Sequence, residues 1–183
     1  MILCMTPFCP ASEGLTPEPG KDFGYAINCA MERLREGDWA FILDHDVSLT
    51  TRGAWFRALE AAVSRYPEAG FFTPMRYPAN TRWLQPKEAL KSYDVREHRK
   101  MGEELAAKYR GQIEDVTDFE KLDGGLPSAG LWLVSKNAWK EVGGFKPGFK
   151  HENVDYDFHK RVRSFGRRVY LLRDVYLFHA KGL

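Results

Sequence analysis

The sequence has few cysteines, no long hydrophobic run and little excess of charge of either sign. Its three cysteines, Cys4, Cys9 and Cys29, lack the even number of a disulfide framework and the spacing of a zinc site, which indicates free thiols in a reducing compartment. No apolar run reaches the about 18 residues that a membrane helix needs, and the first residues lack a basic region followed by an apolar stretch. We therefore expect a cytoplasmic protein without a transmembrane segment.

The charge balance argues against a broad electrostatic surface for nucleic acid. The formal net charge is +2, and hydrophobic and charged residues make up 44% and 28% of the 183 residues, as in ordinary globular proteins. This length fits one domain, and we predict a single domain over residues 1–183. Nucleic acid stays open as a less favoured partner because basic residues gather in residues 76–123, namely Arg76, Arg82, Lys87, Lys91, Arg96, Arg99 and Lys100.

Apolar patterns alternate between strand and helix periods along most of the chain. Strands are predicted at residues 2–5, 39–43, 69–73, 131–135, 168–172 and 175–178, and helices at 23–34, 50–66, 97–109, 137–142 and 154–165. Residues 76–123 break this alternation and are predicted to be an insertion in the same domain. The pattern predicts an α/β fold with a mostly parallel sheet flanked by helices, in which ligands bind beyond the carboxyl ends of the strands.

Two carboxylates, Asp44 and Asp46, follow the apolar strand at 39–43. Side chains two apart in a strand point to the same side, so both carboxylates are expected to face one cleft, whereas His45 faces away and is expected to be structural. Carboxylates held this close repel each other unless a cation lies between them. A hard divalent ion bound also to substrate phosphates meets that need. The alternative is that the two residues only cap the following turn.

Five segments together resemble the family 2 type glycosyltransferases of the GT-A fold. They are GYAIN at 24–28, GDWAFILDHD at 37–46, AGLWLVSKNAWKEVGGF at 129–145, VDYD at 154–157 with Gly166 nine residues later, and VYLFH at 175–179. They occur in the order that the family requires and span nearly the whole chain except residues 76–123. The resemblance implies a GT-A (Rossmann-like) fold with a mixed, mostly parallel sheet.

The resemblance also implies a metal-dependent transfer of a sugar from a nucleoside-diphosphate donor, with UDP-sugars favoured, to an unidentified acceptor hydroxyl, for which a glycan is one candidate. Asp46 and His179 would hold the ion, Mn²⁺ or Mg²⁺, and Asp44 would contact ribose or a metal-bound water. A mixed Asp and His set suits Mn²⁺ somewhat better. The remaining donor-binding positions implied by the resemblance are Thr6, Pro7, Asp22, Asn28, Gly130 and Trp132.

Asp155 is the candidate catalytic base, which the resemblance places where an acceptor hydroxyl loses its proton while attacking the anomeric carbon. Such a displacement inverts the anomeric configuration. The family's Glu before this Asp is Val154 here, and a register two residues earlier would place Glu152 in the motif. Asp155, Asp157 and Glu152 therefore stay open as bases. Carboxylates in a first helical turn can also serve only as favourable charges there.

Two other functions compete with glycosyl transfer. The segment DHDVS at 44–48 also resembles the D-x-D-x-T loop of haloacid-dehalogenase-type phosphatases, in which Asp44 would be the nucleophile and Asp46 the acid/base. This reading is disfavoured because position 48 is Ser and no later Lys is followed by a strand ending in paired Asp residues. The other candidate is a nucleotide-sugar-binding module without turnover, which Val154 in place of Glu keeps open.

Overall fold

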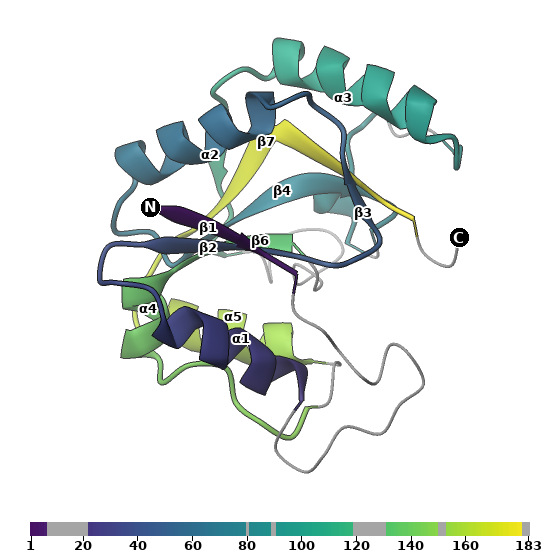
Figure 1. Ribbon diagram of the computed structural model, residues 1–183. Coiled ribbons are helices and arrows are strands. Elements are labelled where there is room, and N and C mark those ends of the chain that lie inside the picture. Colours follow the sequence, from purple (N-terminus) through teal and green to yellow (C-terminus); the bar gives the residue numbers. More distant parts are fainter. Residues whose placement is uncertain (7–21, 80, 89–90, 119–130, 150–152, 181–183) are drawn as a thin grey trace. The chain divides into compact units, whose positions relative to one another are not determined.

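A computed structural model describes residues 1–6, 22–79, 81–88, 91–118, 131–149 and 153–180. These residues form a mixed α/β protein with seven strands in a mixed sheet and flanking helices (Figure 1). The chain divides into two compact units. Unit 1 comprises Met1–His45, Glu68–Phe71 and Ala129–Arg168, and unit 2 comprises Asp46–Pro67, Phe72–Ser128 and Val169–Leu183.

Unit 1 contains a three-stranded group in which parallel and antiparallel pairing meet. Strand β1 (Ile2–Met5) pairs in parallel with β2 (Trp39–Leu43), and β2 pairs antiparallel with β6 (Leu131–Ser135). The register aligns Met5 with Ile42, so β1 and β2 end at the same edge. The residues that follow these two strands, Thr6 and Asp44, therefore lie at one edge of this group.

Three helices accompany these strands in unit 1: α1 (Phe23–Glu32), α4 (Lys136–Glu141) and α5 (Val154–Ser164). Asp22 is the N-cap of α1 and Ser135 is the N-cap of α4, each accepting a backbone N–H of the first turn. Phe145 stacks on Phe158 of α5 with ring centroids 4.1 Å apart, and both rings are fully buried. These contacts build an apolar core for unit 1.

Unit 2 is organised around the long strand β7 (Val169–His179). Strands β3 (Val47–Leu49) and β5 (Ile113–Asp115) both pair antiparallel with β7. Helices α2 (Ala54–Arg65) and α3 (Val95–Lys108) both contact β7 (Figure 1). The unit also holds most of β4 (Phe71–Tyr77) and a 3-10 turn, Arg82–Leu84. None of the helices that the structure describes combines the length and apolar character required to cross a membrane.

Helix α3 is fastened to β7 by a close backbone approach and a buried polar network. A Cβ added to Gly102 of α3 would lie 2.1 Å from Thr50 Oγ1, and that hydroxyl donates to the Tyr176 carbonyl oxygen at 2.6 Å. His98 is fully buried, with Nε2 2.7 Å from the Ser92 carbonyl and Nδ1 2.8 Å from the Tyr176 hydroxyl. Because a carbonyl only accepts, Nε2 donates to Ser92, and Nδ1 shares a hydrogen bond with the Tyr176 hydroxyl. Burial raises the pKa of the Tyr176 hydroxyl, which keeps it protonated.

The elements follow the predicted ones with several differences, among them the two short strands β3 and β5, which were not predicted. The predicted strands at 168–172 and 175–178 are one strand, because Arg173 N–H donates to the Gln112 carbonyl and the Asp174 side chain accepts from Gly111 N–H. Helix α2 begins later than residue 50 because Thr50 bonds to β7 and Gly53 adopts a left-handed φ of 77°. The sheet is mixed, because β1 pairs in parallel with β2 while the β2–β6, β3–β7 and β5–β7 pairs are antiparallel.

Candidate metal centre

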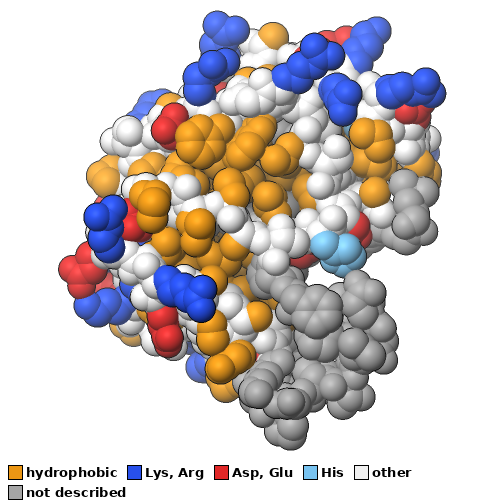
Figure 2. Space-filling model, in the orientation of Figure 1, with side chains coloured by type: hydrophobic (Ala, Val, Ile, Leu, Met, Phe, Trp, Pro, Cys, Tyr) orange, Lys and Arg blue, Asp and Glu red, His pale blue; other side chains and the backbone are white. Residues whose placement is uncertain are grey.

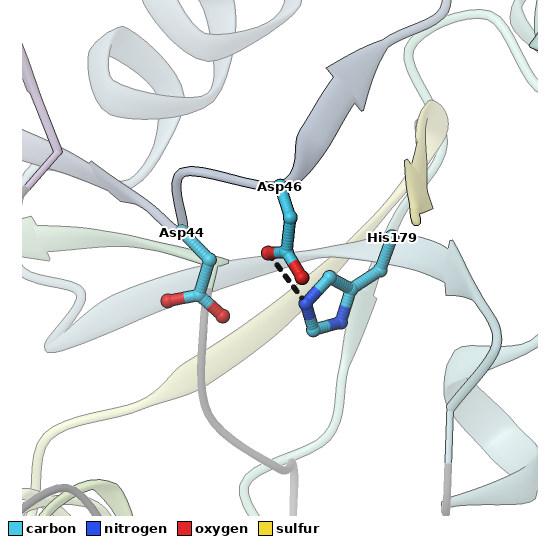
Figure 3. A group of neighbouring side chains, drawn as sticks. All are labelled: Asp44, Asp46 and His179. Atoms are coloured by element: carbon cyan, nitrogen blue, oxygen red, sulfur yellow. Dashed lines mark hydrogen bonds and ion pairs between the residues drawn. The ribbon is translucent and has the colours of Figure 1, made fainter. Parts of the chain in front are cut away.

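Asp46 and His179 meet because β3 and β7 are antiparallel neighbours in unit 2. Asp46 directly precedes β3, and the register aligns the first residue of β3, Val47, with His179 at the end of β7. The Ala180 N–H donates to the Asp46 carbonyl at 2.9 Å and extends this pairing. The side chains converge, with Asp46 Oδ1 2.8 Å from His179 Nε2 (Figure 3). The backbone pairing of β3 with β7 therefore holds Asp46 and His179 next to each other as a candidate pair of metal ligands.

Asp44 follows β2 and lies two residues before Asp46 in the chain. One possible ligand atom each from Asp44, Asp46 and His179 lies within 4.8 Å of the other two (Figure 3). His179 is buried and the two Asp residues are half-buried, whereas His45 between them is exposed. Because His45 and Asp46 lie in a turn after β2 ends at Leu43, the predicted strand alternation does not extend over Asp44, His45 and Asp46. The two predicted metal ligands, Asp46 and His179, thus lie close to each other and to Asp44.

The donor set fits a divalent cation of intermediate hardness. Two carboxylates supply hard oxygen ligands and the imidazole supplies a nitrogen, a combination that suits Mn²⁺ and also permits Mg²⁺ with fewer protein ligands. An ion held by three side chains keeps further coordination positions for water or substrate oxygens. A cation between Asp44 and Asp46 would also remove the repulsion between their negative charges. The site is therefore chemically able to hold a metal together with an oxygen-rich ligand.

The chain matches no protein-family model and no curated protein.

The other predicted donor-side residues divide by position. Thr6 is exposed and follows β1, at the edge of the unit 1 strands where Asp44 follows β2. Asp22 is buried and serves as a cap, because Oδ1 accepts from Tyr25 N–H at 3.0 Å and Oδ2 accepts from Gly148 N–H at 2.5 Å. A nucleobase contact by Asp22 would have to compete with these two bonds. Pro7, Gly130 and Glu152 lie outside the described residues.

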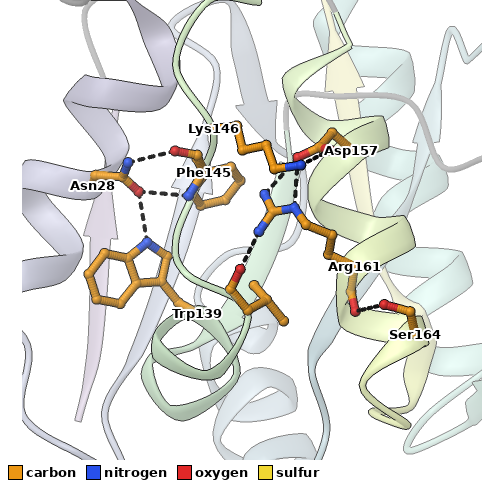
Figure 4. Close-up of polar contacts among 8 residues, drawn as sticks. Asn28, Trp139, Phe145, Lys146, Asp157, Arg161 and Ser164 are labelled. Atoms are coloured by element: carbon orange, nitrogen blue, oxygen red, sulfur yellow. Dashed lines mark hydrogen bonds and ion pairs between the residues drawn. The ribbon is translucent and has the colours of Figure 1, made fainter.

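Asn28 joins α1 to the turn that follows α4 (Figure 4). Its Oδ1 accepts from the Trp139 indole N–H and from the Phe145 N–H, and its Nδ2 donates to the Phe145 carbonyl, all at 2.8 Å. Both oxygen lone pairs are therefore engaged within unit 1. This arrangement gives Asn28 a structural use, and its predicted donor contact stays a prediction.

Trp132 has an exposed fraction of only 1%. Its ring packs against Phe145, with centroids 5.8 Å apart, and meets His159 edge-on at 4.8 Å. Packing of this kind accounts for an aromatic residue at a strand position without any ligand. A sugar-stacking role for Trp132 would require the ring to leave these neighbours, and it also stays a prediction.

Asp155 and Asp157 both lie in the first turn of α5, but in different surroundings. Asp157 Oδ2 lies 2.8 Å from Arg161 Nε and 2.7 Å from its Nη2, and Oδ1 lies 3.4 Å from Lys146 Nζ (Figure 4). Asp155 is buried, with an exposed fraction of 7%. Asp157 is occupied by its contacts with Arg161 and Lys146, which a role as base would have to break, so Asp155 is kept as the preferred candidate and the choice of base stays a prediction.

The sequence alone did not indicate that His98 packs beside the end of β7. Its ring stacks on Phe178, the neighbour of His179, with centroids 3.9 Å apart and an interplanar angle of 11°. His98 thereby packs against a side chain of β7 that is adjacent in sequence to the candidate ligand His179. A signal was available in the spacing of His98, Met101 and Leu105, which places His98 on the buried face of α3.

Proposed function

We propose that this protein is a metal-dependent glycosyltransferase of the GT-A type, which moves a sugar from a nucleoside-diphosphate donor to an acceptor hydroxyl with inversion. The observation that carries the proposal is the grouping of Asp44, Asp46 and His179 where β2 ends and where β3 and β7 pair. Asp44 and Asp46 belong to one of the five segments that resemble the family, and His179, 133 positions after Asp46, belongs to another. UDP is the favoured nucleotide and Mn²⁺ the favoured ion, with Mg²⁺ as the alternative.

The chemistry of the donor explains why such a site would be built. A nucleoside diphosphate leaves with its negative charge on phosphate oxygens, and a bound divalent ion offsets that charge in the transition state. Asp46 and His179 would hold the ion, and Asp44 would contact the ribose or a water on the ion. Asp155 would take the proton of the acceptor hydroxyl as its oxygen attacks the anomeric carbon from the side opposite the leaving diphosphate.

Thermal unfolding against a panel of nucleoside diphosphates, each with and without Mn²⁺, tests the donor half of this proposal. A ligand at 100 times its dissociation constant stabilises the folded state by about 2.7 kcal/mol. We expect UDP to raise the melting temperature only when Mn²⁺ is present, and Asp46→Ala to remove that rise. A rise with another nucleoside diphosphate would support the same donor site but identify a different nucleobase.

The panel also separates the competing functions. If no nucleotide raises the melting temperature while phosphate mimics such as vanadate do, the acidic pair belongs to a phosphatase-like site and the proposal fails. If UDP binds with Mn²⁺ but no acceptor supports turnover, the chain is a nucleotide-binding module. Neither result depends on knowing the acceptor.

A further inference from the structure

Strand β1 forms one edge of the sheet. In the strand order β1-β2-β6-β4-β7-β3, it has β2 as its single neighbour among the strands that the structure describes. The parallel pairing with β2 uses the backbone groups on one side of β1. The backbone groups on its other side face outward at the sheet edge, where water or another chain can bond to them. The glycosyltransferase proposal makes no use of this edge.

The pairing with β2 shows which backbone groups of β1 face outward. The Trp39 N–H donates to the Met1 carbonyl at 2.9 Å, and the register aligns Ile2 with Trp39. The N–H and C=O of one strand residue point to the same side, and successive residues alternate, so Leu3 faces β2 as the Met1 carbonyl does. Ile2 and Cys4 therefore each direct an N–H and a C=O away from the sheet.

The side chains along this edge are apolar and reach solvent. Leu3 has an exposed fraction of 36% and Met1 of 65%, and Cys4 is an exposed free cysteine. Figure 2 shows hydrophobic side chains at the surface of the molecule in the region where Figure 1 places β1. Exposed apolar side chains beside outward-facing backbone groups favour association with another strand.

Strand β1 lacks the features that usually keep edge strands from pairing. Such strands carry charged side chains, proline or a bulge, whereas Ile2–Met5 has no charge and no proline, and its register with β2 is uninterrupted. Strand β5, which pairs with β7 off the main strand order, shows the contrast. It carries the exposed carboxylates Glu114 and Asp115. Charge thus protects β5 and is missing from β1.

A second copy of β1 is the partner that this edge fits. Because β1 is uncharged, an identical strand meets no like-charge repulsion, and no charge on β1 would select an oppositely charged peptide. Identical strands can pair antiparallel about a twofold axis, which closes the assembly at two chains. With the axis beside Leu3, Ile2 of one chain lies opposite Cys4 of the other. Each such pair exchanges two backbone hydrogen bonds, so every outward group of Ile2 and Cys4 gains a partner.

We propose that this protein forms a twofold-symmetric dimer in which the β1 strands of two copies pair antiparallel, with Leu3 facing Leu3 of the partner. The two Leu3 residues form a non-hydrogen-bonded pair, in which Cα atoms lie about 4.5 Å apart and side chains are close. Their contact removes apolar surface from water on both copies. The pairing involves β1 alone and does not rest on the proposed transfer reaction.

Sedimentation equilibrium of the full chain over a range of concentrations tests the proposal. We expect a monomer–dimer equilibrium. Leu3→Lys places two ammonium groups opposite each other and should raise the dimer dissociation constant by about tenfold or more. Phe165→Lys is the matched control, because Phe165 is also a large exposed apolar residue but is the C-cap of α5, and it should leave the dissociation constant unchanged. Circular dichroism checks that both variants are folded.

Three results of this experiment would overturn the proposal. They are a monomer at every concentration, a Leu3→Lys variant that dimerises as the unsubstituted chain does, and loss of the dimer in Phe165→Lys. The last result would place the contact at another apolar surface.

Disulfide cross-linking tests the same pairing without adding a charge to β1. In a chain with Cys4, Cys9 and Cys29 replaced by serine, Leu3→Cys should give a covalent dimer on mild oxidation, because about 4.5 Å between Cα atoms suits a disulfide. A chain that keeps Cys4 and has serine at the other two positions should cross-link far less, because Cys4 and its copy would lie diagonally, about 7–8 Å apart. Cross-linking through Cys4 but not through Leu3→Cys, or through neither, would overturn the proposed pairing.

Discussion

Replacing Asp155 by asparagine is expected to reduce glycosyl transfer by about 10²–10⁴-fold while the affinity for the nucleoside-diphosphate donor stays unchanged. Asparagine has nearly the same shape as aspartate but cannot take a proton from the acceptor hydroxyl. Asp155 is buried in the first turn of α5. Because asparagine matches aspartate in shape, the substitution should disturb the packing of this helix little. Transfer would be measured as UDP release in the presence of acceptor, and donor affinity by titration.

Asp157→Asn is the matched control, since it removes a carboxylate from the same turn. Its loss weakens the contacts with Arg161 and Lys146, so a lower melting temperature with transfer retained is expected. If Asp155→Asn transfers sugar as fast as the unsubstituted chain, Asp155 has no part in the mechanism. If only Asp157→Asn loses transfer, the base is Asp157 and the choice based on its ion pairs is wrong.

Gly102→Ala is expected to lower the free energy of unfolding by about 1–3 kcal/mol, as overpacking of a tight contact does. The new Cβ would lie 2.1 Å from Thr50 Oγ1 and 2.7 Å from Thr50 Cβ, and the Thr50 hydroxyl is held by its bond to Tyr176. Alanine is favoured over glycine within a helix by roughly 1 kcal/mol, so a net loss shows that the clash outweighs the helix propensity. Urea unfolding monitored by circular dichroism measures the difference.

Glu104→Ala provides the control for this substitution. Glu104 lies on the exposed side of the same helix, and a change there is expected to stay within about 0.5 kcal/mol. Because Tyr176 and Phe178 lie on the strand that ends at His179, Gly102→Ala should also weaken Mn²⁺ binding. A stability equal to or higher than that of the unsubstituted chain would show that α3 can move away from Thr50 at no cost.

The strands could be predicted from short stretches of sequence, and the candidate ligands could be predicted from short motifs that resemble a family. Strands β2 and β6 have the predicted bounds: β2 is an apolar run between Asp38 and Asp44, and β6 is an apolar run that ends at Ser135, the N-cap of α4. Asp46 and His179 were paired through resemblance to a family, and the structure brings them within hydrogen-bonding distance. Spacing alone could not have joined residues that are 133 positions apart.

The features that sequence patterns missed depend on contacts between distant segments. Helix α2 begins late because Thr50 bonds to Tyr176, 126 residues away, instead of capping the helix. Asn28 bonds to Phe145, 117 residues away, which a helical pattern does not reveal. The strand β7 continues through Arg173 and Asp174 because Gln112 and Gly111 supply partners for them. Tertiary contacts thus override local preference at each of these positions.

Binding of Mn²⁺, followed by the loss of the free-ion electron paramagnetic resonance signal with UDP present, tests the central claim most directly. The account predicts one saturable site that weakens by about tenfold or more in Asp46→Ala and in His179→Ala, because each removes a ligand. His45→Ala is the matched control from the same turn, and the exposed His45 is predicted to leave binding unchanged. Equal Mn²⁺ affinity in Asp46→Ala and the unsubstituted chain, or no saturable site in the latter, would contradict the account.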